Sequence, residues 1–206
     1  MSRGMRMDSY RKPYQTQVDS LLAAKPELIE RPLSCKRPWQ GRVFDVEVSE
    51  VALPDGSYGY RELARHHGGA GVCVLCDGNM CLVRQWRISV GRMTLEIPAG
   101  KLNDGEDPAV CAARELQEET GLVAGSLEPL ATSYGSIGFS DECTHIFLAH
   151  DVQKGHAHPD KGEFIELCWV PLDEVLTAVR EAKISDSKTI IAALMAQRGT
   201  VSLEGK

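Results

Sequence analysis

The stretch from Gly100 to Leu122, GKLNDGEDPAVCAARELQEETGL, constrains this chain more than any other part of it. We expect a helix over Pro108–Thr120 within it. Asp107 is a good N-cap, and a proline suits the first helical position. Gly121 suits the C′ position, where a left-handed backbone ends a helix. The glycine-containing loop before the helix can bring backbone carbonyls close to it.

Three carboxylates lie on one face of this helix. With Glu115 at the origin, Glu118 falls about 60° to one side and Glu119 about 40° to the other. A solvated acidic face is the ordinary interpretation, but like charges one turn apart destabilise a helix, and no basic partner follows four residues later. Carboxylate and carbonyl oxygens are the ligands of hard cations such as Mg²⁺. Spacing alone leaves both interpretations open. The opposite half of the helix is small and apolar: Ala109, Ala112, Ala113 and Leu116.

The same stretch resembles the Nudix box. That pattern reads Gly, five residues, Glu, seven residues, then Arg-Glu-apolar-any-Glu-Glu-any-Gly-apolar. A match over so many positions is far less open to chance than a short glycine-rich fingerprint. The residues that fill the fixed positions are Gly100, Glu106, Arg114, Glu115, Leu116, Glu118, Glu119, Gly121 and Leu122.

The resemblance implies an α/β (α+β) Nudix fold, in which a mixed sheet lies between helices and the box holds a metal. Glu115 and Glu119 would be direct ligands of Mg²⁺, or of Mn²⁺, helped by the Ala99 carbonyl. Glu118 would bind a metal or position water. Arg114 would orient the carboxylates, and the remaining acid of the box, Glu106, would pair with Arg114.

Over about Gly41 to Leu194 the chain also resembles ADP-ribose and ADP-sugar pyrophosphatases. By this resemblance Arg87 would bind a substrate phosphate, although a surface ion pair is the alternative. The backbone near Lys101 would line the site, and Glu96 is grouped with these substrate-binding residues. The matching segments are Leu82–Arg87, Leu95–Gly100, Gly138–Glu142, Gly162–Glu166 and Ile184–Thr189.

The resemblance places the catalytic base in a later loop, where Glu163 is the first choice. Glu142 is the second choice, with the alternative that it only supports its own loop. Lys161 and Gly162 stand where further acids often occur in that subfamily. Mg²⁺ would neutralise the pyrophosphate and lower the pKa of bound water, while a carboxylate such as Glu163 takes the water's proton.

These residues predict a Mg²⁺-dependent Nudix hydrolase that cleaves the pyrophosphate bond of a nucleoside diphosphate sugar. ADP-ribose, giving AMP and ribose 5-phosphate, is the first expectation. Ile137 replaces the proline of the subfamily's usual Ser-Pro-Gly, so the loop lacks a fixed φ and the exact nucleotide sugar stays open. UDP-glucose, GDP-mannose, flavin or dinucleotide substrates are alternatives, as is a non-catalytic module that senses ADP-ribose.

Three regions are expected along the chain. Residues 1–40 read as a partly disordered extension with a short helix near Thr16–Ala24. Residues 41–66 read as a small antiparallel β lobe, and by resemblance this lobe forms a homodimer. Residues 67–206 would be the Nudix domain. In that domain we expect helices at Pro108–Thr120, Leu172–Ala182 and Ser187–Arg198, and strands at Gly71–Cys76, Met80–Arg87, Thr94–Ile97, Leu127–Ser133, His145–His150 and Phe164–Val170.

Composition limits the partners and the location. A formal net charge of −6 argues against a general nucleic-acid binder, which needs a basic surface. No apolar run is long enough for a bilayer, and residues 1–40 show no secretory signal. We therefore expect a cytoplasmic protein without nucleic-acid or membrane partners.

The cysteines also indicate an intracellular protein. There are seven, an odd number, and most lie in apolar segments, which is typical of reduced and buried thiols. Cys73 and Cys76 form a CxxC that could be half a zinc site or a redox pair, but Cys81 alone supplies no second ligand pair. Core packing is the preferred interpretation.

Overall fold

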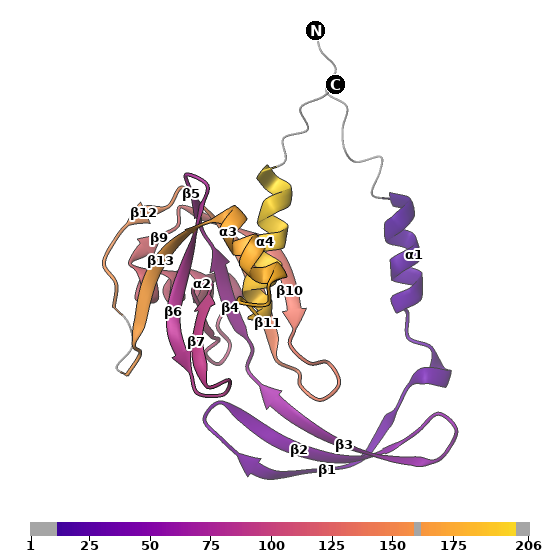
Figure 1. Ribbon diagram of the computed structural model, residues 1–206. Coiled ribbons are helices and arrows are strands. Elements are labelled where there is room, and N and C mark those ends of the chain that lie inside the picture. The colour runs from indigo at the N-terminus through magenta and orange to yellow at the C-terminus, as the bar shows by residue number, and fades with distance from the viewer. Residues whose placement is uncertain (1–11, 159–161, 201–206) are drawn as a thin grey trace. The chain divides into compact units, whose positions relative to one another are not determined.

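The computed structural model describes residues 12–158 and 162–200 (Figure 1). The chain divides into two compact units. One contains Met1–Pro38 and Glu47–Glu62, and the other contains Trp39–Val46 and Leu63–Lys206. Residues 1–11 of the expected extension lie outside the described residues, and so does Lys161, which was compared above with the acids of the subfamily's loop. No helix of the described residues is long and apolar enough to cross a membrane.

The N-terminal sheet contains a strand that the sequence did not suggest. β1, β2 and β3 form one antiparallel sheet in that order, so Arg31–Gln40 is paired rather than part of an extension. The predicted helix near Thr16–Ala24 is present but begins earlier. Gly56, at φ +84°, makes the turn between β2 and β3. The elements are α1 (Lys12–Leu22), η2 (Pro26–Leu28), β1 (Arg31–Gln40), β2 (Phe44–Ala52) and β3 (Tyr58–His66).

The described residues after β3 form two larger sheets, of which one is mixed and the other is antiparallel. One has the order β10-β11-β4-β8, with β11 and β4 parallel and the other pairs antiparallel. The other has the order β13-β6-β5, with β7 also paired to β6. The strands are β4 (Gly69–Cys73), β5 (Leu75–Cys76), β6 (Asn79–Arg87), β7 (Arg92–Glu96), β8 (Ala99–Lys101), β10 (Ser126–Tyr134), β11 (Cys143–His150) and β13 (Ile165–Pro171), with a separate short pair of β9 (Leu122–Val123) and β12 (Gln153–Lys154).

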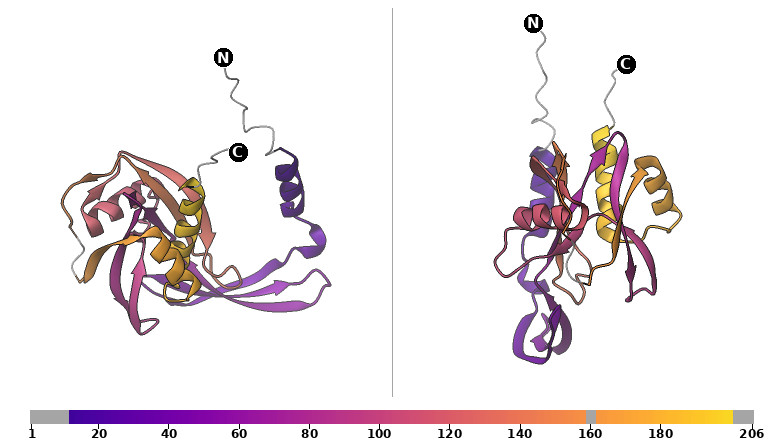
Figure 2. Two further views of the ribbon diagram at one scale, coloured as in Figure 1. Left: turned by 45° about the horizontal axis from the view of Figure 1, so that its top comes forward. Right: turned by 90° about the vertical axis from the view of Figure 1, so that its left-hand side faces the viewer.

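Helices cover both faces of these sheets, as the right-hand view of Figure 2 shows. Alternate residues of β4 point to opposite faces because the side-chain period of a strand is two. Val72 of β4, and Val74 directly after the strand, pack with Leu116 of α2 (Pro108–Thr120) in one buried cluster. Cys73 packs in a second cluster with residues of α3 (Leu172–Arg180) and α4 (Ser187–Thr200). The expected mixed sheet between helices is therefore confirmed.

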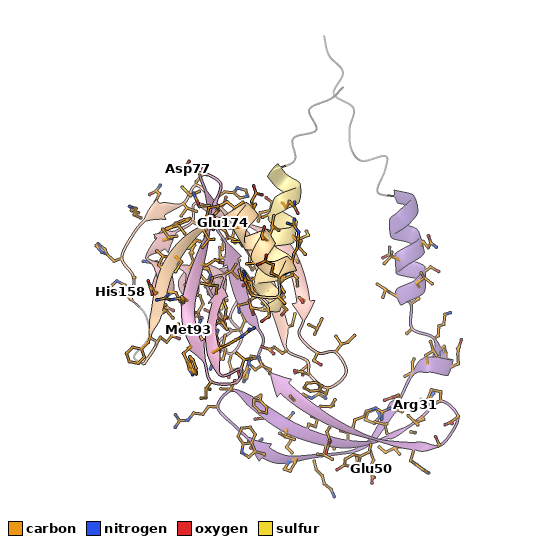
Figure 3. All side chains as sticks on the ribbon, viewed as in Figure 1. Arg31, Glu50, Asp77, Met93, His158 and Glu174 are labelled. Carbon is orange, nitrogen blue, oxygen red and sulfur yellow. The ribbon has the colours of Figure 1, made fainter. Side chains whose placement is uncertain are left out.

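Two local predictions match the structure in detail. α2 spans the residues expected, with the Asp107 carboxylate accepting the N–H groups of Ala109 and Val110 and with Gly121 at φ +71°. The hairpin between β5 and β6 turns at Asp77 and Gly78, which have φ of +48° and +76° (Figure 3). Both signals are local, and tertiary packing did not override them.

The cysteines only partly follow the expectation of buried thiols. Cys73, Cys81 and Cys111 are buried, and burial raises each thiol pKa to about 12. Cys76 is exposed, so for the second cysteine of the CxxC the expectation of burial is wrong. It lies at the end of β5, next to the hairpin turn, where its side chain faces solvent.

Candidate active site

A cleft of about 590 Å³ lies beside α2 and the strand β8 that precedes it. Backbone from Gly68–Ala70 and Ala99–Lys101 forms one wall. Acidic and basic side chains both face the same space. The acidic ones are Glu115, Glu119, Glu142 and Glu163, and the basic ones are His66, Arg87, Lys101, Arg114 and Lys188.

Arg114 gathers the acids of the loop and the helix. Its Nε and Nη2 bind the two carboxylate oxygens of Glu106 at 2.9 and 3.1 Å. Its Nη1 binds Glu115 at 2.7 Å and Glu118 at 2.9 Å. Arg114 thereby holds the pKa of Glu106 at about 2, and these acids raise the pKa of Arg114, Glu106 most strongly. The guanidinium fixes the loop to the helix, as a bidentate pair can.

Gly100 makes room for the Glu115 carboxylate. A Cβ built on Gly100 would fall on the Glu115 carboxyl group, far inside van der Waals contact. The adjacent Gly69 would likewise place a Cβ 2.8 Å from the Gly100 carbonyl oxygen. The absence of side chains at these two positions therefore lets β4, β8 and the helix carboxylate approach one another closely.

Glu119 is the most buried acid of the cleft, with 8% of its surface exposed. Its Oε2 accepts the Ala99 N–H at 3.0 Å. Burial raises the pKa of Glu119 to about 8, with further contributions from the charges of Glu115 and Glu163, while the Ala99 hydrogen bond and Lys188 oppose the rise. A carboxylate with so little water around it gains most from a bound cation.

The pKa of Glu115 is also raised. Burial raises its pKa against the opposing effect of Arg114, and the charges of Glu118 and Glu163 raise it further. Glu163 therefore lies near both Glu115 and Glu119, although it comes from a loop far along the chain. Glu142 lines the cleft and also a side pocket of about 210 Å³.

The residues fit a divalent cation by their chemistry. Glu115 is a half-buried and Glu119 a buried carboxylate, both with raised pKa values, and they lie beside the backbone at Gly100, so they are hard oxygen donors for such an ion. Among the described residues no three acidic, histidine or cysteine side chains are already gathered around one point. Glu118 is held on Arg114 and is not among the described residues that line the cleft. The expected convergence of Glu118 with Glu115 and Glu119 is therefore not present in the side-chain positions.

Glu96 has a different place from that expected of a substrate ligand. It is 3% exposed and is not among the described lining residues of the cleft. Its carboxylate binds Arg87 through two bonds of 2.7 and 2.8 Å. Burial alone would raise the pKa of Glu96, but Arg87, Lys188 and Thr94 outweigh it and lower the pKa to about 2. Glu96 therefore orients Arg87, which does line the cleft.

Lys188 lines the cleft but was not predicted from the sequence as a site residue. Its Nζ binds Glu96 at 2.5 Å and Asp186 at 2.9 Å. Asp186 also accepts the Thr189 N–H and hydroxyl, and Thr189 Oγ1 accepts the Ile97 N–H. The start of α4 is thus tied to the end of β7 and to Ile97, just before β8. The one available signal was that Lys188 lies in the matching segment Ile184–Thr189.

A family model described as NUDIX domain matches residues 65–194. The chain belongs to the Nudix family. Members of this family generally use a divalent metal ion. The match covers every cleft residue that carries a charge, so the acids and bases described above form the candidate active site of a Nudix pyrophosphohydrolase.

Relatives extend over most of this Nudix chain. The ADP-ribose pyrophosphatase of Bacillus subtilis (strain 168) is 38% identical over 168 residues, which are 80% of this chain and 91% of that protein. The methanol dehydrogenase activator of Bacillus methanolicus is 40% identical over 166 residues, 79% of this chain and 90% of the relative. A crystal structure of an ADP compounds hydrolase has a TM-score of 0.74 at 19% identity, over 86% of this chain and 96% of that one, and it shows the shared fold.

Substitution of Gly100 by Ala is expected to damage the Nudix site and spare the fold. The new Cβ displaces the end of a flexible side chain, the Glu115 carboxyl, rather than backbone. We expect turnover to fall by about 100-fold, because a misplacement of about 1 Å at a reacting centre has that effect. Steady-state kinetics and a melting curve check this. In a Glu115→Gln background the Ala substitution should add little, and a full additive loss would contradict the assigned contact.

Substitution of Lys188 by Met is expected to weaken both stability and substrate binding. It leaves two carboxylates beside each other, although Glu96 keeps Arg87, so we expect a loss of roughly 1–3 kcal/mol in the free energy of unfolding. A raised KM should accompany it. Urea unfolding and kinetics measure these effects, with Lys183→Met as the control because Lys183 is an exposed lysine of the same region. Equal stability and equal KM in the two variants would refute the role of Lys188 as a bridge between Glu96 and Asp186.

Proposed function

We propose that this Nudix enzyme hydrolyses the pyrophosphate bond of a nucleoside diphosphate sugar with Mg²⁺, and that ADP-ribose is its substrate. The observation that carries the proposal is that acidic and basic side chains line the same cleft. Glu115 and Glu119 supply oxygen donors for a cation, with the Glu163 carboxylate nearby, and Arg87 and Lys188 supply positive charge for phosphate. Relatives named ADP-ribose pyrophosphatase and ADP-sugar pyrophosphatase support the choice of substrate.

Each residue of the cleft has a proposed role that its position supports. The Arg87 guanidinium, which two hydrogen bonds to Glu96 hold in place, donates to a non-bridging phosphate oxygen. Glu115 and Glu119, with the backbone at Ala99, hold the divalent ion. When bound, that ion neutralises charge on the pyrophosphate and makes water a better nucleophile. Mn²⁺ offers the same coordination chemistry as an alternative.

Glu163 is the proposed general base. Its charge raises the pKa of both Glu115 and Glu119, and it lines the same cleft, which supports a role in taking the proton of the attacking water. Glu142 lines the same cleft and is the alternative base. Glu118 supports Arg114 in this structure, and its role as a ligand or water-positioning group stays a prediction.

A panel of substrates tests the function. Purified protein is incubated with ADP-ribose, UDP-glucose, GDP-mannose and a dinucleotide, each with Mg²⁺ and with EDTA, and the released mononucleotide is separated by ion-exchange chromatography. We expect AMP from ADP-ribose and no release in EDTA. A Glu119→Gln preparation serves as the blank for contaminating activity. Release of no mononucleotide from any substrate would overturn the proposal.

We also propose that the protein acts as a homodimer through the N-terminal sheet. The strands of this sheet expose large apolar side chains that a partner surface could cover, namely Leu33, Trp39, Tyr58 and Tyr60. Light scattering after size exclusion gives the mass directly, and a monomer at micromolar concentration would argue against this. The expected cytoplasmic location also stays a prediction.

A further inference from the structure

His66 is a cleft residue to which none of the roles above applies. It ends β3, is half-buried, and lines the same space as Glu115 and Arg87. Hydrogen bonds hold both its backbone and its ring.

The backbone of His66 is fixed by the loop that carries Glu142. The Ala64 N–H donates to the Phe139 carbonyl at 2.7 Å, and the Asp141 N–H donates back to the Ala64 carbonyl at 3.3 Å. The Asp141 carboxylate then accepts the His66 N–H at 2.9 Å, and it also binds Arg65 at 3.1 Å. The end of β3 is therefore attached to this loop on both sides of Ala64.

The ring of His66 is fixed by Gly68. Its Nδ1 accepts the Gly68 N–H at 2.9 Å. Gly68 has φ +85°, and a Cβ there would lie 2.7 Å from the Cys143 carbonyl oxygen, so this N–H has a set direction. A ring nitrogen that accepts a hydrogen bond carries no proton. In the neutral ring the proton is therefore on Nε2.

The Nε2–H group is a donor without a bonded acceptor within residues 12–158 and 162–200. A half-buried donor on a cleft wall is stabilised when an acceptor fills the cleft. The proposed substrate is rich in acceptors, in its phosphates and its sugars. We propose that His66 is a substrate-binding residue whose Nε2–H donates a hydrogen bond to an oxygen of the bound nucleoside diphosphate sugar; this rests on the function proposed above.

Two substitutions distinguish the role of the His66 Nδ1 acceptor from that of the Nε2–H donor. The Asn side chain of His66→Asn can place an acceptor where Nδ1 lies, so it keeps the bond to Gly68 and loses the donor at Nε2. The longer side chain of His66→Gln can place an amide N–H near Nε2. If the ring served only to hold Gly68, the Asn variant would be the mild one. If it binds substrate, the Gln variant is the mild one.

The test measures binding of α,β-methylene ADP-ribose, which cannot be hydrolysed at that bond, by calorimetry in Mg²⁺. We expect His66→Asn to bind about tenfold more weakly than wild type, as for a lost bond to a charged oxygen, and His66→Gln to bind within about threefold. His67→Asn is the matched control, since His67 is exposed and pairs with Asp104 outside the cleft. KM should rise with kcat little changed.

Wild-type affinity in the Asn variant would overturn the inference, and so would equal losses in both variants. Failure of the wild type itself to bind the analogue would instead count against the proposed function. Comparison of ADP-ribose with ADP-glucose identifies the acceptor. An equal rise in KM for both places the contact on the shared ADP portion, and a rise for ADP-ribose alone places it on the terminal ribose; each result supports a substrate contact.

Discussion

Replacement of Glu119 by Gln should abolish metal-dependent hydrolysis and at the same time make the metal-free protein more stable at alkaline pH. Glu119 is the most buried acid of the cleft, and its carboxylate is a proposed metal ligand. Loss of the ligand charge should reduce kcat/KM by at least about 10³-fold, since metal assistance contributes several kcal/mol to the transition state. The amide oxygen of Gln can still accept the Ala99 N–H, so β8 should keep its place beside α2.

The sign of the stability change follows from the pKa. The Glu119 pKa is about 8 in the folded protein, against an ordinary value of 4.5 for a glutamate. The folded state then binds the proton more tightly, so stability falls as pH rises from the lower value to the higher one. Gln carries no charge at any pH. The difference between variant and wild type should be smallest near the lower pKa, grow through this window, and stay constant above it.

Melting curves in EDTA across this pH window, with kinetics in Mg²⁺, measure both effects. Glu174→Gln is the control, because Glu174 lies exposed on α3 (Figure 3) and should change neither property. Turnover by the Glu119→Gln variant at the wild-type rate would remove Glu119 from the metal site. A variant less stable than wild type at high pH would show that burial does not strain this carboxylate.

The parts of the fold that could be predicted from the sequence are those with local signals. The cap residues around α2 and the Asp77–Gly78 turn determine the conformation of residues only a few positions away, so the local sequence is enough to predict these elements. β1 was missed for the opposite reason. Its segment RPLSCKRPWQ has prolines and no alternation of burial, and it becomes a strand by pairing with β2. β8 is three residues long, too short for any periodicity.

The candidate site divides in the same way. Helical periodicity alone placed Glu115 and Glu119 on one face of α2, and both line the cleft. Lys188 and Glu96 are 92 positions apart, so only the folded chain brings them together. Glu96 was grouped with substrate-binding residues because its segment matches the subfamily, and a segment match does not distinguish a residue that touches substrate from one that holds Arg87. His66 was not predicted because only the folded chain brings it to the cleft and to Asp141, which is 75 positions away.

Chelation of divalent metal should stop hydrolysis completely, and Mg²⁺ should raise the melting temperature far more at about pH 9 than at about pH 6. Below the Glu119 pKa of about 8, a proton already relieves the repulsion between Glu119 and its neighbours Glu115 and Glu163. A cation must displace that proton. Above this pH the carboxylates are charged, and the cation is the partner that stabilises them. Ligand binding to the folded state alone raises stability by mass action.

Differential scanning fluorimetry at the two pH values, with Mg²⁺ titrated into EDTA-treated protein, measures the shift. NaCl at matched ionic strength controls for screening, and the Glu119→Gln variant should lose most of the shift at high pH. An equal shift at both pH values would mean that the ion binds away from Glu119. Arg114 donates hydrogen bonds to both Glu115 and Glu118, whereas among the described residues the hydrogen-bond donor to Glu119 is the Ala99 N–H. Burial raises the pKa of Glu119 to about 8, and it also raises that of Glu115, where Arg114 opposes the rise. The pH dependence of metal binding should therefore come mainly from Glu119.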